Sequence, residues 1–196
     1  MMVKICGITN RGDALAAVDG GASALGFNFY PPSPRYIAPE AAHAILAALP
    51  PGVLKVGVFA NEPAAAVAAL AGRLGLDIVQ LHGESPDIPA GLRVWRALPV
   101  APGFDVASLD PLPAEAFLLD APSGALYGGT GRSFDWSLAR GARRPVILAG
   151  GLDETSVRRA IEEGRPWGVD ACSRLESSPG CKDRGRMAQF LKAAQR

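Results

Sequence analysis

The chain has 196 residues, with 20 Lys and Arg against 19 Asp and Glu, so its formal net charge is only +1. This balance gives no indication of a nucleic-acid or membrane partner. Hydrophobic residues make up 48% of the chain, which is ordinary for a soluble globular protein, and the length predicts one domain over residues 1–196 with a substantial core.

Targeting segments are not expected. Strand-like sequence begins by Val3, which leaves no room for a signal peptide. No apolar run approaches the roughly 20 residues that a membrane span requires. The three cysteines, Cys6, Cys172 and Cys181, have no CxxC spacing and fit a reducing compartment, so the cytoplasm is the expected location.

Short apolar runs rich in β-branched residues alternate with Ala-rich amphipathic segments along the chain. The apolar runs predict eight strands, at residues 3–7, 24–29, 54–59, 77–82, 93–98, 116–120, 145–150 and 168–172. The amphipathic segments predict helices at residues 10–18, 39–49, directly after 61–63, 154–163 and 183–194. After the fourth and fifth strands, Pro and Gly make the helical signal weak.

Several helix ends have recognisable signals. Asn10 and Asp153 are expected N-caps, because their side chains accept hydrogen bonds from free backbone N–H groups. Pro63 is expected in the first turn of its helix, after Asn61 and Glu62. Gly164 is expected to end the helix that precedes it.

Eight strands separated by long crossovers indicate parallel pairing. Their nearly continuous apolar character suits strands that are buried on both faces. Such units either close into a barrel or form an open doubly wound sheet. The chain is short for a barrel of about 250 residues, but weak fourth and fifth helices account for the difference. We therefore predict a single-domain α/β fold, a (βα)8 TIM barrel with short loops.

In either architecture, ligands bind at the carboxyl ends of the strands. The polar and glycine residues found at those ends are the candidates for a site: Cys6, Arg35, His82, Asp120, Gly150, Gly151, Asp170, Cys172 and Ser173.

Two of these strand ends suit a phosphate group. Gly150-Gly151 leads towards a helix, and Ser173 follows the last strand. Glycines let the backbone approach an anion, and these barrels commonly bind phosphate after strands seven and eight. Residues 128–131, Gly-Gly-Thr-Gly, could add to this cradle, although they lack the Lys-Ser/Thr ending of a P-loop. A glycine pair is equally typical of a turn or a helix stop.

Cys6 and Asp120 form a possible acid–base pair. Lys4 and Cys6 share one face of the first strand. A nearby ammonium lowers the pKa of a thiol below its reference value of about 8.5 and so favours the thiolate. Taken alone, Cys6 is more typical of a small buried side chain, and Asp120 suits a turn carboxylate equally well.

The remaining candidates have simpler alternatives. Arg35 lies in a stiff loop and suits bidentate binding of a carboxylate, or else it faces solvent. His82 fits a hydrogen-bonded structural role better than a base or a metal ligand, because His43 is the only other histidine. Cys172 and Cys181 have no obvious partner and are expected to be inert.

Several longer motifs follow one another along almost the whole chain. They are Lys4-Ile5-Cys6-Gly7-Ile8-Thr9, Ser33-Pro34-Arg35-Tyr36, Gly57-Val58-Phe59 with Asn61-Glu62, Val79-Gln80-Leu81-His82-Gly83, Leu119-Asp120 with Gly128-Gly129-Thr130-Gly131, Phe134-Asp135-Trp136, Leu148-Ala149-Gly150-Gly151-Leu152, Gly168-Val169-Asp170, and Glu176-Ser177 with Pro179-Gly180 and Lys182-Asp183. Together they resemble the phosphoribosylanthranilate isomerase family of tryptophan biosynthesis.

This resemblance implies a (βα)8 barrel that needs no cofactor and no metal. The implied reaction is an Amadori rearrangement of N-(5′-phosphoribosyl)anthranilate, with Asp120 as general acid and Cys6 as general base. Arg35 would pair with the anthranilate carboxylate, and Asp170 would hold a sugar hydroxyl. The phosphate would contact three residues: Gly150, Gly151 and Ser173. Monomer and homodimer both stay open.

The chain departs from the family at one point. Where the family commonly has Ser-Ser-Gly, this chain has Cys172-Ser173-Arg174. Without the glycine, a positive φ becomes costly, so the conformation of the phosphate loop is expected to differ. Alternatively, Arg174 supplies a charge to the phosphate, or its side chain simply faces solvent. Two alternative functions stay open: another sugar-phosphate isomerase or epimerase, and a non-catalytic barrel that binds a phosphorylated metabolite.

Overall fold

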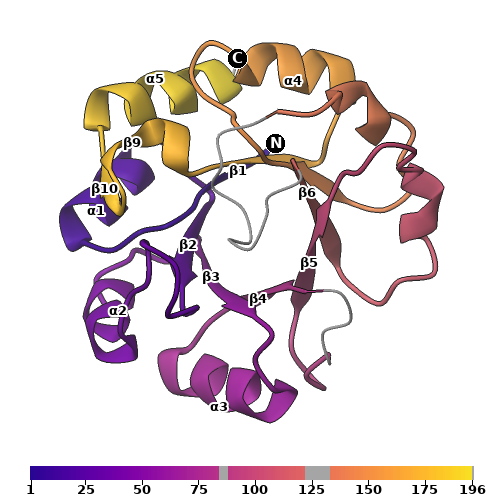
Figure 1. The fold of residues 1–196 in the computed structure, drawn as a ribbon. Helices are drawn as coiled ribbons and strands as arrows, with labels where there is room; N and C mark the ends of the chain where they lie inside the picture. Colours follow the sequence, from indigo (N-terminus) through magenta and orange to yellow (C-terminus); the bar gives the residue numbers. More distant parts are fainter. Residues whose placement is uncertain (84–87, 122–132, 196) are drawn as a thin grey trace.

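The computed structural model describes residues 1–83, 88–121 and 133–195. Eight parallel strands close into a barrel in sequence order, and β1 pairs with both β2 and β8 (Figure 1). The predicted barrel is thus confirmed, and the open-sheet alternative is wrong. The strands of the barrel are β1 Met2–Ile5, β2 Ala24–Asn28, β3 Leu54–Ala60, β4 Ile78–His82, β5 Val94–Pro99, β6 Ala116–Asp120, β7 Val146–Leu148 and β8 Gly168–Ala171.

Helices cover the outside of the barrel unevenly (Figure 1). The α-helices are α1 Arg11–Asp19, α2 Pro39–Leu46, α3 Ala64–Leu74, α4 Val157–Gly164 and α5 Arg184–Ala194. Three short 3₁₀ helices are η1 Val106–Leu109, η2 Trp136–Ala139 and η3 Ser173–Leu175. Within the described residues, the connections from β4 to β7 contain no α-helix, which agrees with the weak helical signal there. None of the helices in residues 1–83, 88–121 and 133–195 is long and apolar enough to cross a membrane.

Alternation along the strands separates two apolar clusters. Side chains that point into the barrel, such as Ile78, Trp95 and Leu118, form an inner cluster. Side chains on the other face, such as Leu25 and Phe117, pack against the helices in a larger outer cluster. Every second side chain of a strand points into the barrel. The last inward-pointing side chain of a strand therefore lies at the polar mouth of the barrel.

Some helix ends differ from the sequence prediction. Asn10 caps α1 as expected, since its side chain accepts from the Asp13 N–H at 2.9 Å. Pro63 occupies the cap position of α3 without a side-chain cap bond. α4 ends at Gly164 as predicted, but the left-handed residue at its end is Arg165, with φ 48°. Gly164 is needed for packing, because a Cβ there would lie 2.8 Å from both the Leu148 side chain and the Trp136 carbonyl oxygen.

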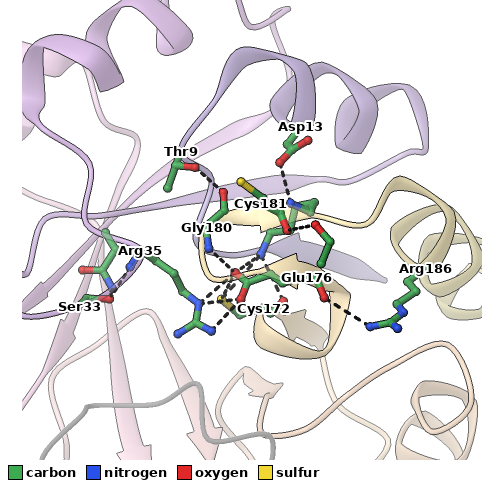
Figure 2. Close-up of polar contacts among 12 residues, drawn as sticks. Thr9, Asp13, Ser33, Arg35, Cys172, Glu176, Gly180, Cys181 and Arg186 are labelled. Carbon is green, nitrogen blue, oxygen red and sulfur yellow. Dashed lines mark hydrogen bonds and ion pairs between the residues drawn. The ribbon is translucent and has the colours of Figure 1, made fainter.

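A small hairpin that we did not predict follows the last barrel strand. It pairs β9, Glu176–Ser178, with β10, Cys181–Lys182, in antiparallel fashion. Pro179-Gly180 forms its turn, and Gly180 has φ 83°. The hairpin lies against the loop after β1, where the Thr9 hydroxyl donates to the Gly180 carbonyl (Figure 2).

Candidate active site

A pocket opens at the carboxyl ends of the barrel strands. It is lined by residues of β2, β3, β4, β6 and β8, by Cys6 directly after β1, and by the loops that follow β2, β7 and β8. Each of the seven residues that the resemblance placed in a site lines this one pocket, namely Cys6, Arg35, Asp120, Gly150, Gly151, Asp170 and Ser173. The Gly-Gly-Thr-Gly segment at 128–131 lies outside the described residues.

Lys4 and Asp170 form a buried ion pair beneath the pocket. Lys4 Nζ lies 2.9 Å from Asp170 Oδ1, and the Lys4 side chain is 0% exposed. Burial alone would lower the pKa of Lys4, but the charges of Asp170 and Cys6 outweigh it and raise that pKa. Burial raises the pKa of Asp170 against the attraction of Lys4. Asp170, expected to hold a sugar hydroxyl, therefore also anchors the cation next to Cys6.

Cys6 lies one residue beyond β1, on the same face as Lys4. A hydrogen bond from the Cys172 thiol is the largest effect on Cys6 and, with the Lys4 charge, it holds the pKa of Cys6 well below its usual value despite burial. The pKa of Cys172 is raised correspondingly by the same hydrogen bond and by burial. These opposite shifts favour the thiolate at Cys6 and the thiol at Cys172. The expectation that Cys172 has no partner is wrong, because two strand ends bring it against Cys6.

Asp120 ends β6 and lines the same pocket as the cysteine pair. Its Oδ1 accepts the Ala121 N–H at 2.8 Å. Burial raises the pKa of Asp120 to about 6, and the negative charge of Cys6 adds to this effect. The pocket therefore contains a carboxyl group that holds its proton more tightly than usual, together with a thiol that releases its proton more readily than usual. Such opposite shifts of two pKa values in one pocket are typical of acid–base pairs in enzymes.

Arg35 reaches the pocket from the loop after β2 and is held by Glu176 (Figure 2). Arg35 Nε lies 3.0 Å from Glu176 Oε1, and Nη2 lies 2.7 Å from Oε2. Lys182 Nζ binds the same carboxylate at 3.0 Å, and the Glu176 side chain is only 4% exposed. Although burial alone would raise it, the pKa of Glu176 is lowered by the hydrogen bond from Arg35 and the charge of Lys182. One carboxylate thus orients two cations beside the pocket.

The loop after β7 has the backbone that its glycines predicted. Gly150 and Gly151 have φ angles of 76° and 67°, a left-handed conformation that glycine adopts without strain. After the neighbouring strand β8, Ser173 begins η3, and Ser173 and the exposed Arg174 line the same pocket. Arg174 is not among the positive-φ residues of the described chain, so this loop does not require the glycine that the family commonly has there.

His82 has the hydrogen-bonded environment that its sequence context favoured. Gln80 Nε2 lies 3.0 Å from His82 Nε2. Burial lowers the pKa of His82 to about 4, and the Lys4 charge acts in the same direction, so the imidazole is neutral near pH 7. No group of three or more His, Cys, Asp or Glu side chains in the described residues could hold a metal ion.

Sequence reasoning missed the roles of three residues: Cys172, Glu176 and Lys182. Cys172 acts on Cys6 and Glu176 acts on Arg35, which are distant in sequence, so a local pattern could not identify these two roles. Lys182 acts on Glu176, which lies six positions away. A weak signal existed for the last two, because Glu176 and Lys182 flank the Pro-Gly turn and a hairpin would place them side by side.

Removal of the Lys4 cation is expected to destabilise the protein. In Lys4→Met, buried Asp170 loses its partner, which costs about 3–5 kcal/mol in comparable cases. Urea unfolding followed by tryptophan fluorescence measures this loss. The double variant Lys4→Met/Asp170→Asn should recover part of it, because it leaves no unpaired buried charge. Lys4→Met should also slow Cys6 alkylation at neutral pH; unchanged stability and alkylation would contradict this assignment.

The closed parallel barrel, with a polar pocket at the carboxyl ends of its strands, is the architecture of the (βα)8 barrel enzymes. A profile of the family "N-(5'phosphoribosyl)anthranilate (PRA) isomerase" matches residues 3–193. The chain belongs to this family of isomerases.

Individual relatives agree with this assignment. The N-(5'-phosphoribosyl)anthranilate isomerase of Solibacter usitatus is 53% identical over 197 residues, covering 100% of this chain and 98% of the relative. The crystal structure of the isomerase from Thermotoga maritima has a TM-score of 0.90 at 42% identity, covering 100% of this chain and 98% of that one. A crystal structure of a phosphoribosyl anthranilate isomerase in complex with reduced 1-(o-carboxyphenylamino)-1-deoxyribulose 5-phosphate has a TM-score of 0.86 at 40% identity, with the same coverage.

Proposed function

We propose that this chain catalyses the Amadori rearrangement of N-(5′-phosphoribosyl)anthranilate to 1-(2-carboxyphenylamino)-1-deoxyribulose 5-phosphate, a step of tryptophan biosynthesis. The observation that carries this proposal is the acid–base pair. Cys6, with a lowered pKa, and Asp120, with a pKa raised to about 6, line one pocket in a chain of this isomerase family.

In the first step, protonated Asp120 donates its proton to the furanose ring oxygen. The ring C–O bond breaks, and the anthranilate nitrogen supplies the electron pair that forms a Schiff base. The Cys6 thiolate then removes the C2′ proton to give an enolamine, which tautomerises to the ketone. Both pKa shifts act in the direction that these roles need, because burial and the charge of Cys6 favour the acid form of Asp120 while Cys172 and Lys4 favour the thiolate.

Binding of the substrate divides between two sides of the pocket. Arg35 pairs with the anthranilate carboxylate, and Glu176 supports it by fixing the guanidinium plane. Gly150, Gly151 and Ser173 bind the phosphate through backbone N–H groups and a hydroxyl, with the left-handed glycines bringing the backbone close to the anion. Asp170 accepts a hydrogen bond from a sugar hydroxyl.

The test of this function uses the fluorescence of the anthranilate group. Protein mixed with freshly made substrate in the presence of a chelator should consume it and yield the ketose product. Substrate that binds without turnover would indicate a non-catalytic barrel. Turnover only of other sugar phosphates would indicate a different isomerase or epimerase.

Replacement of Arg35 by Lys is expected to weaken substrate binding more than chemistry. A single ammonium cannot bridge Glu176 and a substrate carboxylate as the planar guanidinium can. Losing a charged hydrogen bond costs about 1.5–3 kcal/mol, so KM should rise about 10- to 100-fold with a smaller change in kcat. Steady-state kinetics measures this, with Arg73→Lys at an exposed ion pair as control. An unchanged KM would refute the role of Arg35.

We propose a cytoplasmic location, which is supported by a biosynthetic role and by three free cysteines. Monomer and homodimer remain alternatives, and a structure of monomers made from the dimeric isomerase of T. maritima, 41% identical to this chain, favours the dimer. Sedimentation equilibrium distinguishes the two states.

A further inference from the structure

Cys6 and Cys172 face each other across the seam between β1 and β8. The register of this pair ends with Ile5 opposite Ala171. The Cys6 N–H donates to the Ala171 carbonyl at 2.9 Å, which continues the ladder by one residue and sets Cys6 opposite Cys172. Two residues earlier, and so on the same face, Lys4 and Asp170 are in direct contact at 2.9 Å.

The geometry of this pair suits a covalent bond. Neighbouring strands lie about 4.8 Å apart, inside the Cα–Cα range of about 4.4–6.8 Å that disulfides require. The two sulfur atoms are already joined by a hydrogen bond. Both cysteines are half-buried and line the pocket, so a small molecule that enters it reaches them.

We propose that Cys6 and Cys172 are an oxidative modification site, at which a hydroperoxide in the pocket converts the two thiols into a disulfide. Nucleophilic attack requires a thiolate, and at Cys6 this form is favoured because the Cys172 thiol donates to it and the Lys4 ammonium lies beside it. The exposed Cys181 has no comparable environment described in the structure.

The first step is attack of the Cys6 thiolate on a peroxide oxygen. An S–O bond forms, the O–O bond breaks and hydroxide leaves, which gives a sulfenic acid on Cys6. This removes the negative charge that kept the proton on Cys172.

In the second step Cys172 attacks the Cys6 sulfur. The ammonium of Lys182 lies 3.8 Å from Cys172 Sγ and supports its thiolate. The S–S bond forms, the S–O bond breaks, and the departing hydroxide takes the Cys172 proton to form water. The two sulfur atoms together give up two electrons, and the hydrogen peroxide is reduced to one water and one hydroxide.

In the disulfide the sulfur of Cys6 is covalently bonded to Cys172, so in the oxidised protein Cys6 has no thiolate. This consequence rests on the proposed function, in which Cys6 is the general base. Activity should then fall about 10²-fold or more and return on treatment with dithiothreitol, which reopens the bond by thiol exchange.

Peptide mapping of the oxidised full-length protein tests the modification without any activity measurement. Trypsin cleaves after Lys4, Arg11 and Arg174, so Cys6, Cys172 and Cys181 fall in three different peptides. After treatment with hydrogen peroxide and without reduction, the Cys6 and Cys172 peptides should be joined, two hydrogens lighter than the sum. Sulfinic acid on Cys6 with a free Cys172 thiol, or a disulfide that contains Cys181, would overturn the proposal.

Two serine variants separate this site from general oxidation. Cys181→Ser should form the same disulfide and regain its activity with dithiothreitol. Cys172→Ser, whatever its starting activity, should form no intramolecular disulfide, and prolonged peroxide should leave Cys6 as sulfinic acid that dithiothreitol does not reduce. If Cys172→Ser recovers as fully as the wild type, the proposal is wrong. If the disulfide forms in a protein without isomerase activity, the proposed function alone fails.

Discussion

Replacement of Asp120 by Asn is expected to lower kcat by about 10²- to 10⁴-fold, the usual contribution of a general acid. The amide has the size of the carboxyl group and keeps its acceptor for the Ala121 N–H, which lies at 2.8 Å. It cannot release a proton to the ring oxygen. Stopped-flow or steady-state fluorescence of the anthranilate group measures the loss.

The pH profile adds a second readout for Asp120. The protonated form is the active one, so kcat/KM of the wild type should fall as pH rises through about 6, the pKa of the buried carboxyl. The residual activity of Asp120→Asn should lack this alkaline limb. Its free energy of unfolding should stay within about 1 kcal/mol of the wild type, since no hydrogen bond is lost. A variant with full kcat, or one with an unchanged limb, would show that another group supplies the proton.

Cys6→Ser is expected to reduce kcat on a similar scale, about 10²- to 10⁴-fold. Serine is nearly isosteric, but its hydroxyl does not ionise near neutral pH, so Lys4 and Cys172 have no thiolate to stabilise. KM should change little, because no binding contact has been assigned to the sulfur. Single-turnover kinetics separates this loss in chemistry from any effect on product release.

Cys181→Ser provides the matched control for Cys6→Ser. Cys181 is exposed in the hairpin and lies outside the residues that line the pocket, so its replacement should leave kcat and KM unchanged. Near-full activity of Cys6→Ser would exclude this residue as the general base. Equal losses in both variants would point to a general effect on folding.

Much of the fold could be predicted because its signals are local. Strands buried on both faces are continuous apolar runs, and the barrel places the carboxyl end of every strand at one mouth. This is why Cys6, Asp120 and Asp170, which belong to three separate strands, could be assigned to one site before any contact was known. Helix ends were less certain, as Gly164 shows, because a glycine needed for close packing has the same local sequence as one needed for a turn.

The residues that the sequence did not identify depend on long-range contacts. Glu176 reaches Arg35 across 141 positions of the chain, through a hairpin whose docking cannot be inferred from its own seven residues, 176–182. Cys172 lies against Cys6 only because of the register between the first and last barrel strands. A one-residue slip would have turned it to the other face.

The pairing of β1 with β8 also determines when the surroundings of Cys6 are completed during folding. Lys4 and Asp170 are 166 positions apart, so during synthesis the cation waits without its counter-charge until nearly all of the chain has emerged. Cys6 likewise lacks its thiol neighbour until that strand docks. On the proposed mechanism, a growing chain would therefore have no working base until the barrel closes.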